Sequence, residues 1–212
     1  MDESALPEKP GLPWENRRDL GFFPAMMGTL KGVLLEPAPT FRDMRRNAGI
    51  GDAVLYTVFL GTVGGVVGLA WQALVSALGP VLGFDMGQDF AESMIGLGVL
   101  AVLMPALVIL GAFIVAGVVH LCALAFGAGQ HGFEVTFKVV AYAQGSTAIL
   151  QVVPIFGGIV GFVWALVVSV IGMTQAQETS GGRAAGAVLA PVGLCCVCWV
   201  FALIVVIATA GL

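Results

Sequence analysis

The stretch FKVVAYAQGSTAILQVVPIFGGIVGFVWALVVSVIGM, residues 137–173, decides the fold of this chain. After Lys138, no charged residue occurs for 39 residues. One helix needs about 20 apolar residues to cross a bilayer, so this run is long enough for two crossings. Pro154, followed closely by two glycines, interrupts the run near its middle, where a proline ends or kinks a helix. The stretch therefore predicts two membrane-spanning helices, over 138–153 and 155–173, joined by a very short turn.

Composition places the whole chain in a membrane. Of its 212 residues, 58% are hydrophobic and only 10% are charged, and the mean hydropathy is +0.99. Soluble domains carry about 25% charged residues, so a water-exposed globule is excluded. Seven of the nine Lys and Arg residues and eight of the thirteen acidic residues lie before residue 53, which leaves that segment nearly neutral. Nothing in this distribution indicates nucleic-acid binding, and the expected partner is the lipid bilayer.

Three further apolar runs complete a predicted domain over 53–212. We place them at 53–78, at 94–125 with a kink at Pro105, and at 187–210; a re-entrant start of the second run stays open as an alternative. The fold class is thus all-α, a polytopic membrane bundle of five transmembrane helices. Small residues let membrane helices approach closely, and the glycines predicted to do so are Gly61, Gly64, Gly65, Gly68, Gly157 and Gly161.

The segment before the first span is predicted to be cytoplasmic and to have two parts. Residues 1–20 are polar and contain several prolines, which is typical of a disordered tail. Residues 21–52 contain an amphipathic helix over 21–35 and a short basic helix after it. The amphipathic helix fits either the membrane interface or an ordinary packed position on the bundle. The basic residues Arg42, Arg45 and Arg46 suit an anionic membrane surface.

Charge also predicts the orientation. With five spans, the N-terminal segment and the loops at 126–137 and 175–186 share one side of the membrane. That side, counted to its boundary residues, holds all nine Lys and Arg residues. The positive-inside rule therefore predicts a cytoplasmic N-terminus and a C-terminus on the opposite side.

Candidate chemistry is sparse, and we predict no catalytic residue, no metal site and no cofactor. His120 and Cys122 could join His131 and Glu134 around zinc, but the spacing matches no ligand pattern and favours a hydrogen-bonded histidine. The three cysteines Cys195, Cys196 and Cys198 lie inside a span, where small packing residues are the better interpretation.

One polar stripe occurs within the predicted spans. Gln144, Thr147 and Gln151 recur at i, i+3 and i+7 of the third span and so share one helix face. Such a face can line a polar cavity or hydrogen-bond to neighbouring helices.

The order of several segments resembles the Yip family, membrane proteins that interact with Ypt/Rab GTPases, and in particular its uncharacterised bacterial branch. The resemblance covers about residues 24–190, and its segments are PAMMGTLKGVLLEPAPTFRDM, FGAGQHGFEVTFKVVAYAQGSTAILQVVPIFG, GFVWALVVSVIGMTQAQETS and RAAGAVLAP. The resemblance implies five spans with a cytoplasmic N-terminus, and it offers no catalytic residues. In the eukaryotic members an acidic-Leu-Tyr-Gly-Pro signature precedes the first span, where this chain has RRNAGIGDAVLYT.

Two functions follow as hypotheses. The first is a non-enzymatic membrane protein of the Yip type in a bacterial cytoplasmic membrane, which binds a partner or organises lipid through its cytoplasmic N-terminal segment. The second is a small transporter or channel, formed as a homo-oligomer, with the polar face of the third span along its path.

Overall fold

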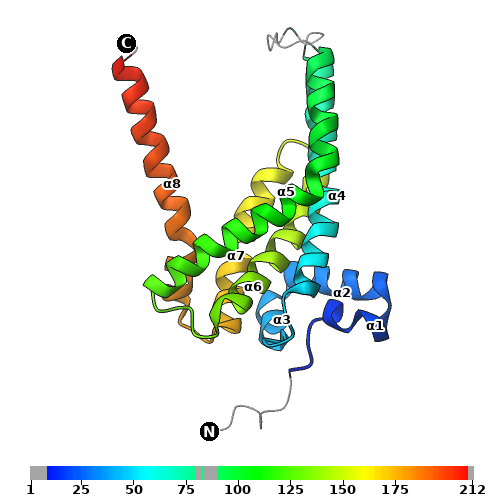
Figure 1. Ribbon diagram of the computed structural model, residues 1–212, viewed down its shortest axis with the longest axis vertical. Coiled ribbons are helices and arrows are strands. Elements are labelled where there is room, and N and C mark those ends of the chain that lie inside the picture. The colour runs from blue at the N-terminus through cyan, green and yellow to red at the C-terminus, as the bar shows by residue number, and fades with distance from the viewer. Residues whose placement is uncertain (1–8, 80–82, 84–89, 210–212) are drawn as a thin grey trace.

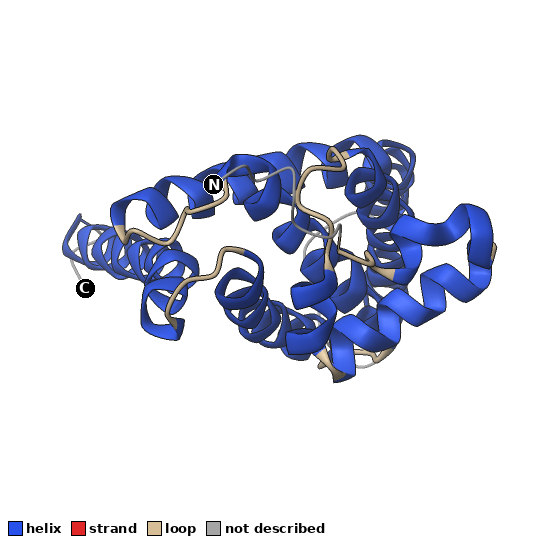
Figure 2. Cartoon of the chain, turned by 90° about the horizontal axis from the view of Figure 1, so that it is seen from below, coloured by secondary structure: helices blue, strands red, loops and turns tan. Residues whose placement is uncertain are grey.

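The computed structural model describes residues 9–79, 83 and 90–209, and within them every regular element is a helix. Figure 2 shows these helices and the loops between them. Four of the helices are long and apolar enough to cross a membrane. The prediction of an all-α membrane helix bundle is confirmed. The elements are η2 (Pro13–Asn16), α1 (Arg17–Leu20), α2 (Phe22–Leu35), α3 (Pro37–Asp43), α4 (Gly51–Leu78), α5 (Phe90–Ala125), α6 (Gly132–Ala148), η3 (Ile149–Val152), α7 (Gly157–Ala176) and α8 (Gly181–Thr209).

The four helices with sufficient length and hydropathy are α4, α5 from Met94 onward, α7 and α8. The predicted third span, over 138–153, falls on α6 and η3, and α6 has only 17 residues. The number of spans, five, therefore stays a prediction. As the proline suggested, the helical stretch ends at Val152 and α7 begins at Gly157, so a short turn joins them.

Two helices contain an internal proline. Pro105 lies within α5 and Pro191 within α8, and a proline removes one helical hydrogen bond and permits a bend. In Figure 1, α5 first runs beside α4 and then crosses the bundle diagonally toward the base of α8. The upper part of α8 stands apart from the other helices, and every residue from Gly193 to Thr209 is exposed. That exposed length of helix is available to lipid.

The centre of the bundle is α6, which contacts α4, α5 and α7. All residues from Val135 to Ala143 are buried. Aromatic rings continue this core toward the N-terminus: the ring of Tyr56 on α4 lies 5.2 Å from that of Tyr142 on α6 and 5.6 Å from that of Trp14. The Tyr56 and Ser146 hydroxyl oxygens are 2.8 Å apart. Because most of α6 packs against other helices rather than lipid, it needs no continuous apolar outer surface, which is compatible with its modest hydropathy.

Glycines allow close contacts of α4 on two sides. A Cβ built on Gly61 would lie 2.8 Å from Val108 of α5, and Gly65 faces the same helix. On the other side, a Cβ on Gly64 would collide with the backbone carbonyl of Ala148 on α6. Since real side chains do not approach so closely, α4 can hold this position only with glycine at these contacts.

Three more glycines surround η3. A Cβ on Gly68 would collide with the side chain of Gln151, and one on Gly157 would collide with the Leu150 carbonyl. Gly161 is less crowded, with a Cβ position 3.1 Å from the Thr147 carbonyl. Gly64 and these three glycines therefore lie where α4 and α7 approach the end of α6, whereas Gly61 and Gly65 face α5.

The prediction of a disordered tail over 1–20 is wrong for residues 9–20; residues 1–8 lie outside the described part of the chain. The chain enters η2 at Pro13, a favourable first helical residue, and Leu12 and Trp14 are each only 1% exposed. Burying these two side chains anchors a segment whose average composition is polar. We call residues 9–50 the N-terminal cap.

Candidate functional site

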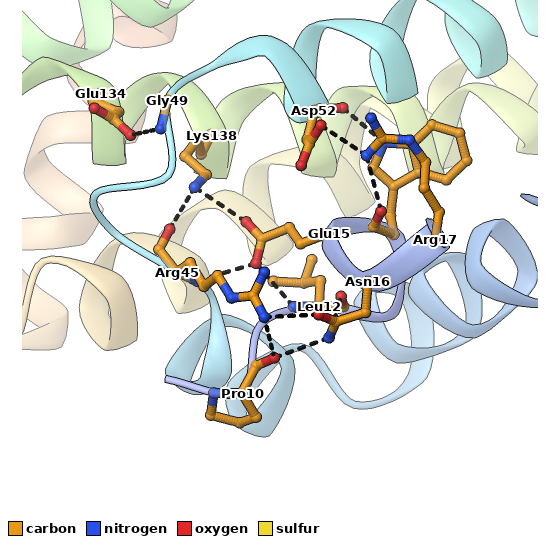
Figure 3. Close-up of polar contacts among 11 residues, drawn as sticks. Pro10, Leu12, Glu15, Asn16, Arg17, Arg45, Gly49, Asp52, Glu134 and Lys138 are labelled. Atoms are coloured by element: carbon orange, nitrogen blue, oxygen red, sulfur yellow. Dashed lines mark hydrogen bonds and ion pairs between the residues drawn. The ribbon is translucent and has the colours of Figure 1, made fainter. Parts of the chain in front are cut away.

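The N-terminal cap is held on the bundle by a buried ion pair (Figure 3). Glu15 Oε1 lies 3.1 Å from Lys138 Nζ on α6, and each side chain is 1% exposed. Lys138 also donates a hydrogen bond to the Arg45 carbonyl. The second carboxylate oxygen of Glu15 accepts hydrogen bonds from the backbone N–H groups of Leu12, at 2.9 Å, and Arg45, at 3.1 Å. A buried pair is tolerated when further hydrogen bonds satisfy both charges, as they do here.

A second set of contacts fastens the cap to the start of α4. Arg17 Nη1 lies 2.7 Å from the Asp52 carboxylate, and Trp14 Nε1 donates to the Asp52 carbonyl at 2.7 Å. The Arg17 guanidinium also lies 5.1 Å from the centre of the Trp14 ring. The Trp14 backbone N–H donates to the Thr29 hydroxyl at 2.8 Å, which ties η2 to α2. Trp14 of η2 therefore bonds to both α2 and α4.

A third set joins the cap to the loop between α7 and α8. Arg46 donates a hydrogen bond to Glu178 and lies 2.8 Å from His131 Nε2. That hydrogen bond and the positive charge of Arg46 lower the pKa of Glu178 despite partial burial. The side chain of Gln177, fully buried, accepts from the His131 backbone N–H at 2.6 Å and donates to the Gly132 carbonyl at 3.0 Å. The loop before α6, the cap and the loop before α8 therefore form one polar network.

The three arginines predicted to face the membrane surface have different environments. Arg42 is exposed, and its Nε lies 3.4 Å from Gln175 Oε1. Arg45 is half-buried and donates to the Asn16 side chain at 2.7 Å and to the Pro10 carbonyl at 3.3 Å. Arg46 is half-buried as well. All three guanidinium groups thus bond within the protein, and those of Arg45 and Arg46 are also half-buried, a structural role that the sequence did not indicate.

The predicted polar stripe lines a groove between α6 and the helices α5, α7 and α8. Gln144, Thr147 and Gln151 all line this groove, which has a volume of about 790 Å³. Its walls come from α5, α7 and α8, and its lining is mainly apolar. One further polar residue, Ser169 on α7, lies in the wall and is 7% exposed. The structure therefore brings the stripe together with a hydroxyl from a second helix.

The remaining candidates have simpler roles. His120 Nδ1 lies 3.0 Å from the Thr136 hydroxyl oxygen, so the predicted hydrogen-bonded histidine is confirmed. Among the described residues, no three His, Cys, Asp or Glu side chains gather as metal ligands would. Cys195, Cys196 and Cys198 are exposed and so lie outside the buried core of this chain; their role as small packing residues stays a prediction. The reason is that α8 leaves the bundle after its first turns, which takes them away from the core.

Glu15, Lys138 and Ser169 were missed from the sequence. Lys138 could have been recognised, because a single lysine directly before a run of 39 uncharged residues needs an acidic partner in the folded protein. The sequence does not show which of many acidic residues supplies it. Nothing in the sequence indicates a role for Ser169 in the groove, since a single serine in an apolar helix ordinarily hydrogen-bonds to the backbone of its own helix.

Comparison with known proteins identifies the family of this chain. The family model described as the Yip1 domain matches residues 31–202, most of the chain. The chain belongs to the Yip1 domain family. No curated protein and no solved structure matches it. The family match begins within α2, so Glu15 and Trp14 lie before it, whereas Lys138 and Asp52 lie inside it. The cap contacts thus join residues outside the matched region to residues within it.

Proposed function

We propose that this Yip-family protein is a non-enzymatic scaffold that organises the membrane and binds partners through its N-terminal cap. We further propose a bacterial cytoplasmic membrane as its location, with the cap on the cytoplasmic side. The supporting observation is that α2 is firmly fastened to the bundle and yet presents a row of exposed apolar side chains. These side chains are Phe22, Phe23, Met27 and Leu35, and the exposed Lys31 lies on the same face between the last two.

The exposed row on α2 is continuous with the outer surface of the bundle. The Phe22 ring lies 5.4 Å from that of Phe59, an exposed residue of α4, and a similar distance from that of Phe23. In Figure 1, α2 lies crosswise near the first turns of α4. An amphipathic helix at the end of a transmembrane helix suits the boundary between headgroups and acyl chains. The opposite face of α2, which includes Met26 and Val33, is buried inside the protein.

Rigid attachment is what favours an organising role. A free amphipathic helix adjusts its depth and angle to the bilayer. Here the buried Glu15–Lys138 pair fixes η2 on α6, and the hydrogen bond from the Trp14 N–H to Thr29 ties α2 to η2. The chain would then insert apolar volume into one leaflet at a fixed place. That action can bend or order the membrane and can present a defined surface to a partner.

The test replaces the outward apolar residues without disturbing the inner face. In Phe23→Glu/Leu35→Glu, two charges enter the exposed row; Asn47→Glu/Ala48→Glu adds the same charge at exposed positions elsewhere on the cap. We expect the full-length protein to narrow the diameter distribution of reconstituted vesicles. In cells, a proximity-labelling enzyme fused to its N-terminus should label a defined set of neighbouring proteins. Both properties should be lost in the first variant and kept in the second. Equal behaviour of the two variants, with both folded, would overturn the proposal.

A further inference from the structure

The groove beside α6 opens toward the bilayer. Its walls include Phe162 and Trp199, whose side chains are 55% and 76% exposed and belong to the outer surface of the bundle. No charged residue is among its described lining residues. Its volume of about 790 Å³ lies within the range of about 300–1,000 Å³ found for small-molecule sites. A ligand could therefore enter sideways from the acyl chains without crossing a charged barrier.

Polar groups inside the groove lack partners within the described chain. Ser169 is more than nine-tenths buried, and its hydroxyl makes no hydrogen bond to any described residue. The side-chain amides of Gln144 and Gln151 are half-buried and also make none; the amide oxygen of Gln151 packs against Gly68 of α4, so its NH2 group is the part left to bond to a ligand. Thr147 donates its hydroxyl hydrogen to the Ala143 carbonyl at 2.9 Å, which leaves its oxygen free to accept. In an apolar surrounding, unpaired amides and hydroxyls are costly, so an occupant that bonds to them is favoured.

The spacing of these polar side chains indicates which kind of molecule can bond to them. From Gln144 on α6 to Gln151 on η3 the row extends about 12 Å, so it suits several separate oxygen atoms rather than one compact head group. Amides and hydroxyls both donate and accept, which matches ester and hydroxyl oxygens. A charged head group would find no counter-charge among the described lining residues and would be strongly disfavoured at this depth.

We propose that this groove binds a neutral glycerolipid of the diacylglycerol class. Its ester and hydroxyl oxygens bond to Gln144, Gln151 and Ser169, and its chains lie against the apolar walls of α5, α7 and α8. The proposal rests on the groove alone and does not depend on the function of the N-terminal cap.

Native cysteines provide the test. Cys195 and Cys196 line the groove, whereas Cys198 is exposed on the same helix and is not among the lining residues. The full-length protein, purified in detergent, is treated with N-ethylmaleimide, and the alkylation rate of each cysteine is measured by mass spectrometry. We expect added diacylglycerol to slow alkylation of Cys195 and Cys196 severalfold and to leave Cys198 unchanged. Phosphatidylglycerol with the same chains should protect much less.

Two variants separate specific binding from general coating by lipid. Gln144→Leu/Gln151→Leu removes two neutral hydrogen bonds, each contributing a factor of roughly two to ten, so protection should need about four- to a hundredfold more diacylglycerol. The control Gln72→Leu changes an exposed glutamine of α4 that does not line the groove, and it should leave protection unchanged. Thermal melting checks that both variants are folded.

Four results would overturn the proposal. One is equal protection of all three cysteines, and another is equal protection by phosphatidylglycerol. A third is protection by an isoprenoid quinone but not by diacylglycerol. The fourth is protection that rises with protein concentration in the absence of lipid, which would place a second copy of the chain in the groove.

Discussion

At the residue scale, the Glu15–Lys138 pair is the most sensitive point of the molecule, because both charges are almost completely removed from water. Replacing Lys138 with methionine leaves the Glu15 carboxylate buried with two N–H donors but no counter-charge. We expect Lys138→Met to destabilise the cap by about 3–5 kcal/mol. Hydrogen exchange of residues 9–50 and the melting temperature in detergent measure this loss.

The double variant Glu15→Gln/Lys138→Met supplies the control for this effect. Glutamine keeps an oxygen that can accept from the Leu12 and Arg45 N–H groups, and no unpaired charge remains. Much of the stability should therefore return. Lys31→Met, on an exposed position of α2, serves as the matched single change and should have little effect. If Lys138→Met were no worse than Lys31→Met, the ion pair would not fasten the cap.

At the element scale, glycine determines how closely α4 and α6 approach. Gly64→Ala places a methyl group against the Ala148 carbonyl, so one helix has to move. Overpacking of this kind costs about 1–3 kcal/mol. Gly117→Ala on α5 is the matched control, because nothing lies within 4 Å of its added Cβ. Alanine there should be neutral or stabilising by up to about 1 kcal/mol through helix propensity. Melting temperatures in one detergent compare the two; equal shifts would contradict the close contact.

The elements also show how far the sequence could predict this fold. Long apolar runs specified α4, α5, α7 and α8, because hydropathy and the helical hydrogen-bonding requirement in lipid leave few alternatives. The order within η2 and α1 could not be predicted, since Trp14 and Glu15 are stabilised by contacts with Asp52 and Lys138, far along the chain. The polar stripe on α6 could be recognised from its spacing, but its meeting with Ser169 depends on how α7 packs.

At the scale of the whole molecule, the placement of the termini depends on whether α6 and η3 together cross the membrane. The 17 residues of α6 extend about 26 Å at 1.5 Å per residue. The four residues of η3 add about 8 Å at 2.0 Å per residue. Six of the α6 residues precede Lys138 and lie on the side of the cap, so the part from Lys138 to Val152 extends about 25 Å, which approaches the hydrocarbon thickness of about 30 Å. In agreement, Trp71, late in α4, donates its indole N–H to the Gln151 carbonyl at 3.1 Å, so η3 lies level with the far part of a spanning helix.

We therefore expect five crossings and termini on opposite sides of the membrane. Reporter fusions active on only one side, placed separately at each terminus, measure this directly. The N-terminal fusion should report the cytoplasm, because the side with the cap and the polar loops carries the Lys and Arg residues. A cysteine introduced as Ser180→Cys, in the loop before α8, should react from the N-terminal side. If both termini reported the same side, α6 and η3 would form a buried hairpin arm that enters the bundle without crossing, and the bundle would have four spans.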